Sequence, residues 1–220
     1  MEQNNKFIIP TAIVIAGIVV AIAIFYSVGS SGPATQPTKN TDGSLPEVTS
    51  SDFVLGETSA PVTVVEYGDY QCPFCGKFYR ETEQVIRDQY VSKGKVRWVY
   101  RDFAFLGQES TWASEAARCA ADQGKFWQMH DYLYTHQNGE NEGAFSKDNL
   151  KKFAKALGLD QGSFDSCLDT GKYTSAVQAE TVAGGKAGVN GTPANFINGK
   201  LNVGALPTSQ FVQLIEEALK

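Results

Sequence analysis

The sequence predicts an α/β protein in which a block of helices separates the segments that form the sheet. Three observations support this fold class. A strand, a helix and a second strand follow one another between residues 62 and 100. A helical stretch broken by glycine-bearing turns occupies about 106–188, and two short strands with a final helix follow from residue 194. The order β-α-β, helices, β-β-α indicates a single sheet that carries a helical insertion.

The first part of the sheet is predicted to be a β-α-β unit. Val62–Tyr67 is almost continuously apolar, as expected of a strand that is buried on both faces. A helix is expected from Cys75 to about Ser92, where Lys93-Gly94-Lys95 ends it. Val96–Tyr100 reads as the second strand. Because β-α-β connections are right-handed, we expect these two strands to be parallel, with the helix crossing over one face of the sheet.

The helices and strands of the insertion and of the C-terminal part are predicted from the positions of glycines and from the periodicity of apolar residues. Ala194–Ile197 and Leu201–Val203 are expected to form a hairpin, because Asn198-Gly199 between them is a strong turn signal. Pro207–Lys220 carries its apolar residues on one face and is predicted to be the final helix. A polar loop is expected at Gln137–Ala144 inside the insertion. The helices predicted for the insertion are Ser110–Gln123, Phe126–His136, Ser146–Leu157, Gln161–Leu168 and Tyr173–Ala187.

The N-terminal part of the chain is predicted to be a membrane anchor and a linker. Phe7–Val28 is a stretch of 22 residues without a charged side chain, long enough to cross about 30 Å of hydrocarbon as a helix. A cleaved signal peptide is the alternative, although its apolar core is usually shorter. Lys6 precedes the stretch and no charge follows until Lys39, which favours a single-pass orientation with the N-terminus inside. Gly29–Ser50 reads as a flexible linker, so residues 51–220 form the globular domain, on the extracytoplasmic side of the cell membrane.

The composition narrows the possible functions. The net charge is −5 and no cluster of Lys and Arg occurs, so we expect no nucleic-acid partner. Four cysteines, an even number, suit an oxidising compartment outside the cytoplasm.

Cys72-Pro73-Phe74-Cys75 lies between the first strand and the following helix. Free backbone N–H groups at a helix start carry partial positive charge, which favours the thiolate form of Cys72. A stabilised thiolate is a good leaving group, so a disulfide across this pair is easily exchanged. Half of a zinc site is the alternative. However, the other candidate ligands form no second Cys-x-x-Cys, and we expect His130 and His136 on the surface of an amphipathic helix, so we predict no metal site.

Two motifs resemble the DsbA-like family of extracytoplasmic thiol:disulfide oxidoreductases, particularly its membrane-anchored members. They are EYGDYQCPFC at residues 66–75 and GTPANFING at residues 191–199. Segments 118–120, 123–127 and 167–169 are also similar to members of this family. The resemblance covers about residues 53–220 and implies a thioredoxin-like fold with an inserted helical domain. We expect no cofactor.

The resemblance also implies roles for individual residues. Pro193 would be a cis-proline that faces the cysteine pair, and Thr192 would present backbone groups to an extended substrate by strand addition. Glu66 lies six residues before Cys72, where the superfamily carries a buried acid. Taken alone, it would more often be an exposed carboxylate at a strand end, but its apolar neighbours argue for burial. Desolvation would raise its pKa and suit it to relay a proton to or from Cys75.

The function that we expect is an oxidase that introduces disulfides into unfolded or reduced exported proteins, with a quinone-linked membrane oxidoreductase restoring its own disulfide. Pro73 and Phe74 would contact the substrate. Many of the strongly oxidising members carry histidine where Phe74 stands, so the sequence leaves the redox potential open. A reductase or isomerase of the same fold is one alternative, and a non-catalytic, membrane-tethered binding module is another. We expect a monomer, because Gly29–Ser50 is too short for the separate domain through which isomerases dimerise.

Cys119 and Cys167 are predicted to form a structural disulfide. Both lie in predicted helices of the insertion, away from the Cys-x-x-Cys pair, and an oxidising compartment favours pairing. Two buried free thiols are the alternative, since unpaired cysteine is common in protein cores.

Overall fold

The computed structural model describes residues 45–220. The predicted membrane anchor at Phe7–Val28 and most of the predicted linker lie outside the described residues. Among residues 45–220, no helix has both the length and the apolar character needed to cross a membrane.

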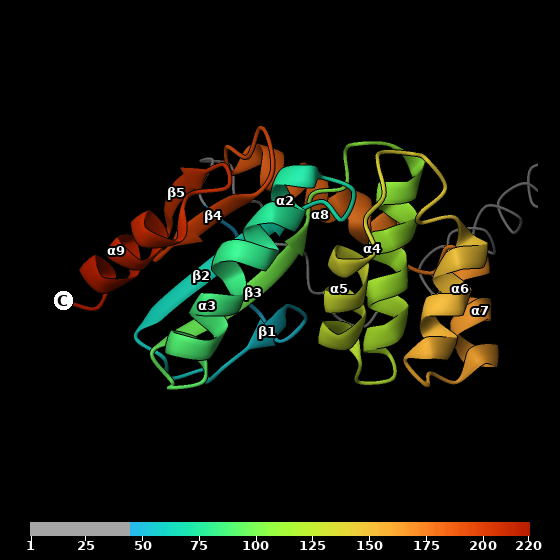
Figure 1. Cartoon of the computed structure of the whole chain (residues 1–220), viewed down its shortest axis with the longest axis horizontal. Coiled ribbons are helices and arrows are strands. Elements are labelled where there is room, and N and C mark those ends of the chain that lie inside the picture. The colour runs from blue at the N-terminus through green and yellow to red at the C-terminus, as the bar shows by residue number, and fades with distance from the viewer. Residues whose placement is uncertain (1–44) are drawn as a thin grey trace, which may run out of the picture. The chain divides into compact units, whose positions relative to one another are not determined.

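The described part of the chain is built on one mixed sheet of five strands, in the order β1-β3-β2-β4-β5 (Figure 1). The central strands β2 and β3 are parallel and in register from Val62 opposite Val96 to Gly68 opposite Asp102, as the sequence predicts. Strand β1 pairs antiparallel with β3, β4 with β2, and β5 with β4. The strands are β1 (Phe53–Leu55), β2 (Val62–Gly68), β3 (Val96–Asp102), β4 (Ala194–Ile197) and β5 (Lys200–Val203).

The crossover between β2 and β3 is one helical segment with two π-helical stretches. It consists of α2 (Pro73–Phe78), the π-helix η1 (Tyr79–Glu83), α3 (Gln84–Ile86) and the π-helix η2 (Arg87–Val91). The insertion lies between β3 and β4, and α9 (Thr208–Ala218) closes the chain. The helices of the insertion are α4 (Gln108–Ala121), α5 (Phe126–Thr135), α6 (Lys147–Ala156), α7 (Gln161–Asp169) and α8 (Thr174–Lys186).

Apolar clusters cover both faces of the sheet. On one face, Val64 and Trp98 pack with Phe78 of α2 and Phe211 of α9. On the other face, a cluster around Tyr67 and Phe196 receives the residues that follow α8. A third cluster fills the helical insertion and reaches the cysteine pair. Because both faces are covered, β2 is apolar along most of its length rather than alternating.

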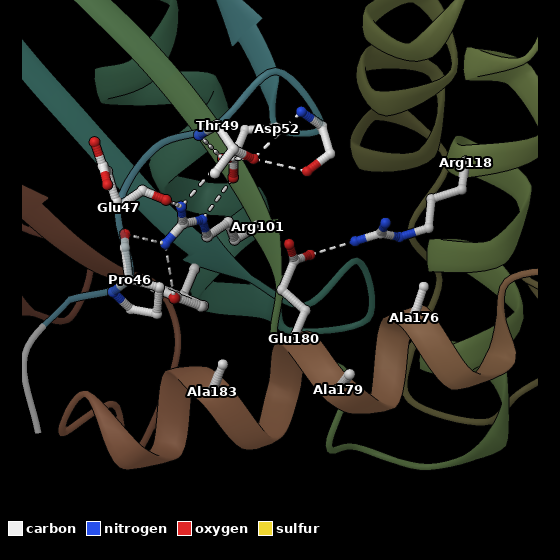
Figure 2. A pocket seen from close by; sticks show the side chains of 12 residues that line it. Pro46, Glu47, Thr49, Asp52, Arg101, Arg118, Ala176, Ala179, Glu180 and Ala183 are labelled. Atoms are coloured by element: carbon white, nitrogen blue, oxygen red, sulfur yellow. Dashed lines mark hydrogen bonds and ion pairs between the residues drawn. The ribbon is translucent and has the colours of Figure 1, made fainter. Parts of the chain in front are cut away.

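The chain before β1 packs against the sheet. Leu45 and Val48 contact the apolar cluster around Tyr67. The guanidinium of Arg101 on β3 donates to the carbonyl oxygens of Pro46 at 2.9 Å and Glu47 at 3.0 Å (Figure 2). The ordered contacts of the domain therefore include residues 45–50, which the sequence analysis assigns to the linker.

Candidate active site

The cysteine pair lies where β2 passes into α2. Cys72 has an extended backbone, with φ −64° and ψ 118°, and is the residue before the helix. Pro73 takes the first helical position, where the absence of an N–H group costs no hydrogen bond. Cys72 is 5% exposed and Cys75 is fully buried, and both are free thiols. Only Cys72 is therefore open to a reactant from solution.

The two thiols have opposite acidities. The pKa of Cys72 is lowered to about 6, first by the hydrogen bond from the Cys75 thiol, then by Thr192 and the backbone N–H groups of Cys75 and Phe74. Burial raises the pKa of Cys75 well above its ordinary value. The lowered pKa favours the thiolate form of Cys72 and the raised pKa favours the thiol form of Cys75, which fits the predicted role of Cys72 as the nucleophile.

The second motif lies against the first. The Cys72 Sγ atom is 3.4 Å from the carbonyl oxygen of Thr192, although 120 residues separate them in the sequence. The Thr192-Pro193 peptide bond is cis, as the resemblance implies. Pro73 is exposed, and the Phe74 side chain is 63% exposed. The side chain expected to meet a substrate is thus available beside the reactive sulfur.

Glu66 is buried in the middle of the sheet, between Tyr100 of β3 and Asn195 of β4. Within the described residues, neither of its carboxyl oxygens has a hydrogen-bond partner. Burial is the main reason that its pKa is raised, and repulsion from Glu83 adds to the effect. The charge of Glu66 also raises the pKa of Cys75, so the two groups interact electrostatically.

A second buried acid, which the sequence analysis did not identify, lies near Glu66. Glu83 of η1 is fully buried and forms an ion pair with Arg87, which also contacts Asp131 at 2.8 Å. Burial raises the pKa of Glu83 to about 7. The Nε2 atom of His130 is 3.9 Å from Glu83, and its Nδ1 atom is 3.0 Å from Asp131.

The expectation that His130 lies on the surface is wrong. His130 is fully buried against the rings of Tyr70, Tyr100 and Trp127, and burial lowers its pKa to about 4. The sequence does contain the signal, because His130 follows Phe126 by four residues on the apolar face of α5. His136 is exposed, as expected. Nowhere in residues 45–220 do three or more His, Cys, Asp or Glu side chains converge so that they could hold a metal ion.

The loop before Cys72 is fixed by side chains whose role the sequence analysis also missed. The Asp69 carboxylate is buried and accepts hydrogen bonds from the backbone of Gln71 at 2.8 Å and from the Ser110 hydroxyl at 2.7 Å. Its other oxygen accepts from the backbone N–H groups of Phe105 and Leu106, at 3.0 and 3.2 Å. The start of the insertion is thereby attached to the active-site loop.

Cys119 and Cys167 form a disulfide that joins α4 to α7, with a Cα–Cα distance of 5.9 Å. This pairing is the one predicted from the sequence, and the bond lies in the apolar cluster of the insertion. It leaves Cys72 and Cys75 as the two free thiols of the described chain.

Comparison with known proteins agrees with this geometry. A family model described as thioredoxin matches residues 48–217. The chain belongs to the thioredoxin family. The probable disulfide bond formation protein D of Bacillus anthracis is 27% identical over 205 residues, which are 91% of this chain and 92% of that protein. The crystal structure of oxidised BdbD from Bacillus subtilis has a TM-score of 0.70 and 27% identity, covering 80% of this chain and 93% of that one. The expected resemblance to DsbA-like proteins is confirmed.

A different kind of relative shares only this domain. The Na(+)/H(+) antiporter NhaA 3 of Salinispora tropica is 36% identical over 155 residues, which are 70% of this chain. The matched part is 22% of the antiporter, so the chain spans about a fifth of that relative's length.

Proposed function

We propose that this DsbA-like protein is a thiol:disulfide oxidoreductase that forms disulfides in exported proteins. The observation that carries the proposal is the contrast within one pair of thiols. Cys72 has a pKa lowered to about 6 and is near the surface, whereas Cys75 is buried with a raised pKa. In a disulfide between two such groups, a substrate thiolate attacks more easily at Cys72. The stable Cys72 thiolate also stabilises the reduced pair, which makes the disulfide a better oxidant.

The reaction begins from the oxidised pair. A substrate thiolate attacks the Cys72 sulfur, the Cys72–Cys75 bond breaks, and Cys75 leaves with the electron pair. Because Cys75 is fully buried, its thiolate is unstable there and takes up a proton, which Glu66 is placed to supply. A second substrate thiolate then attacks the substrate sulfur of the mixed disulfide, and Cys72 leaves as a thiolate. The substrate has lost two electrons and gained a disulfide, while the enzyme pair is reduced.

The surroundings of the pair support an unfolded protein chain as the substrate. Exposed Phe74 offers an apolar contact to an unfolded chain, and the backbone of Thr192 accepts an extended segment by strand addition. We further propose that a quinone-linked membrane oxidoreductase reoxidises the pair and that the protein acts as a monomer. Anchoring by Phe7–Val28 would hold the catalytic domain on the extracytoplasmic side of the cell membrane. The name of the Bacillus anthracis relative supports a role in disulfide formation.

The two single cysteine variants test the proposed roles. Cys72→Ser should abolish oxidation of a reduced two-cysteine peptide. Cys75→Ser has no disulfide of its own, so it is incubated with the disulfide-linked dimer of a one-cysteine peptide. Cys72 attacks one peptide sulfur, the other peptide leaves as a thiolate, and the mixed disulfide on Cys72 should accumulate because the resolving Cys75 thiol is absent. Both outcomes are read by mass spectrometry of acid-quenched reactions. If alkylation at mildly acidic pH labels Cys75 faster than Cys72, the assignment of the nucleophile is wrong.

A redox titration of the purified domain separates the proposed oxidase from its alternatives. A midpoint well above about −200 mV supports an oxidase, one near about −270 mV a reductase, and one below about −300 mV a structural disulfide in a binding module.

A further inference from the structure

A side chain from the insertion crosses the active-site loop. Gln137 follows α5 and its cap residue, and its amide nitrogen donates to the carbonyl oxygens of Tyr70 at 2.6 Å and Cys72 at 3.0 Å. Two carbonyl acceptors require the NH₂ group, which fixes the orientation of the amide. Gln137 thus contacts the backbone on both sides of Gln71, and one of these contacts is made to the nucleophile itself.

The amide oxygen of Gln137 occupies the space beside Gly76. A Cβ atom built on Gly76 would lie 1.8 Å from the Gln137 Oε1 atom and 2.7 Å from its Cδ atom. Gly76 lies within helix α2, where glycine is a poorer helix former than alanine. A steric requirement therefore explains the glycine at position 76, because any larger residue would displace the Gln137 amide.

The loop that carries Gln137 is itself fixed at several points. The backbone N–H of Asn141 donates to the Gln71 side chain at 2.5 Å, and the Asn141 amide donates to the Leu106 carbonyl at 2.7 Å. The buried carboxylate of Glu109 accepts from the backbone of Gly143 at 2.8 Å. Gln137 is thus held from α5 on one side and from the rest of its loop on the other.

We propose that Gln137 is a positioning residue for Cys72 and that Gly76 is glycine because it must leave room for the Gln137 amide. The Cys72 carbonyl also accepts the first helical hydrogen bond, from the Gly76 N–H at 3.1 Å. With both bonds in place, the peptide after Cys72 is fixed, and the N–H groups of Phe74 and Cys75 stay directed at the Cys72 sulfur. This inference rests on the proposed function only in taking Cys72 as the reactive thiol.

The first experiment measures the pKa of Cys72 from the pH dependence of its alkylation in the reduced protein. Gln137→Ala should raise this pKa by about half a unit to one unit, the equivalent of one neutral hydrogen bond lost from the thiolate environment. Asn138→Ala is the matched control, because Asn138 is the exposed neighbour and should leave the pKa unchanged. An unaltered pKa in folded Gln137→Ala would overturn the proposal.

The second experiment tests the Gly76–Gln137 pair by a double-mutant cycle. Gly76→Ala alone should raise the pKa of Cys72 as Gln137→Ala does, since it displaces the same amide. In the Gln137→Ala background, Gly76→Ala should add no further shift and should raise the urea midpoint, because alanine is the better helix former. Additive pKa shifts would overturn the pairing. If Gly76→Ala alone does not fold, restored folding in the double variant supports the pairing, and continued failure to fold contradicts it.

These measurements need neither a substrate nor a partner protein. A redox midpoint typical of a reductase would therefore contradict the proposed oxidase and leave the test of Gln137 intact.

Discussion

At the scale of single residues, Glu66 is a buried acid whose charged form is poorly stabilised by its surroundings. It is fully buried, its carboxyl oxygens have no hydrogen-bond partner among the described residues, and Glu83 repels its charge. The charged form is disfavoured, so Glu66 holds its proton up to the raised pKa and releases it above that pH. The raised pKa is consistent with the proposed role of Glu66 as a proton donor for the Cys75 thiolate.

We predict that Glu66→Gln changes the pH dependence of peptide oxidation. In the natural protein, the step that forms the Cys75 thiolate should slow as the pH rises through the raised pKa of Glu66, because the proton donor is lost. The glutamine variant has no titrating group at this position, so this slowing should disappear while the fold is retained. Identical pH profiles for the two proteins, measured by stopped-flow with a reduced peptide, would remove Glu66 from the mechanism.

Some residues of the candidate active site could be predicted from the sequence and others could not, and the difference is whether they belong to a short motif. Cys72, Thr192 and Glu66 are found because each belongs to a short contiguous motif. Gln137 and Glu83 belong to none. Gln137 acts through backbone carbonyls 67 and 65 residues away in the sequence, a contact that leaves no periodic signal. Glu83 is a charged residue in a helix, which by default indicates an exposed position.

At the scale of elements, sequence patterns predict the long segments well and the short or irregular ones poorly. The three residues of β1 are too few to show alternation, so the strand is visible only through its pairing with β3. A single helix is predicted from Cys75 to about Ser92, but the segment spans Pro73–Val91 and two stretches in it are π-helical. A π-helical turn changes which side chains face the sheet, and Thr82 and Glu83 of this segment are buried.

The disulfide between α4 and α7 gives a prediction for the stability of the insertion. It closes a loop with a sequence separation of 48 residues, which in the chain-entropy model stabilises the fold by about 4 kcal/mol. Replacing Cys119 and Cys167 together by alanine should lower the free energy of unfolding by about this amount, measured with urea.

The measurement is best made in a Cys72→Ser/Cys75→Ser background, so that the redox state of the catalytic pair does not contribute. In this background, adding a reductant should lower the stability of the protein that retains Cys119 and Cys167 to that of the alanine variant. An unchanged urea midpoint after the double replacement would show that the bond does not stabilise the fold.

At the scale of the whole molecule, ionic groups are buried at both faces of the sheet. At one face, Glu83 of η1 pairs with Arg87 of η2. At the other face, beside a pocket of about 430 Å³, Arg118 bridges Asp102 of β3 and Glu180 of α8. Figure 2 shows the pair with Glu180. Buried ion pairs add little net stability, but their titration makes stability depend on pH.

The balance of these groups predicts that the protein is more stable near pH 5 than at pH 7. The pKa of Glu66 is raised, and those of Glu83 and Glu180 are raised to about 7 from 4.5. A carboxyl whose pKa is raised by folding contributes most below its unfolded pKa, and this contribution is lost as the pH rises through the folded pKa. His130 opposes them, because its pKa is lowered from 6.5 to about 4 and its contribution grows as the pH rises across that interval. The three carboxyls, together with Asp69, whose pKa burial also raises, act against one histidine.

Urea unfolding at pH 5 and pH 7 measures this difference in the free energy of unfolding. The oxidised protein is used because Cys72 does not titrate when it is disulfide-bonded. Glu83→Gln should reduce the loss of stability between these two pH values by an amount on the order of 1–3 kcal/mol, because one of the three carboxyls is removed. The absolute stability of this variant also reflects the lost partner of Arg87, so the pH dependence is the informative quantity. Stability that rises from pH 5 to pH 7 would mean that His130 outweighs the buried carboxyls and that the pKa values of these carboxyls are nearer to their ordinary range.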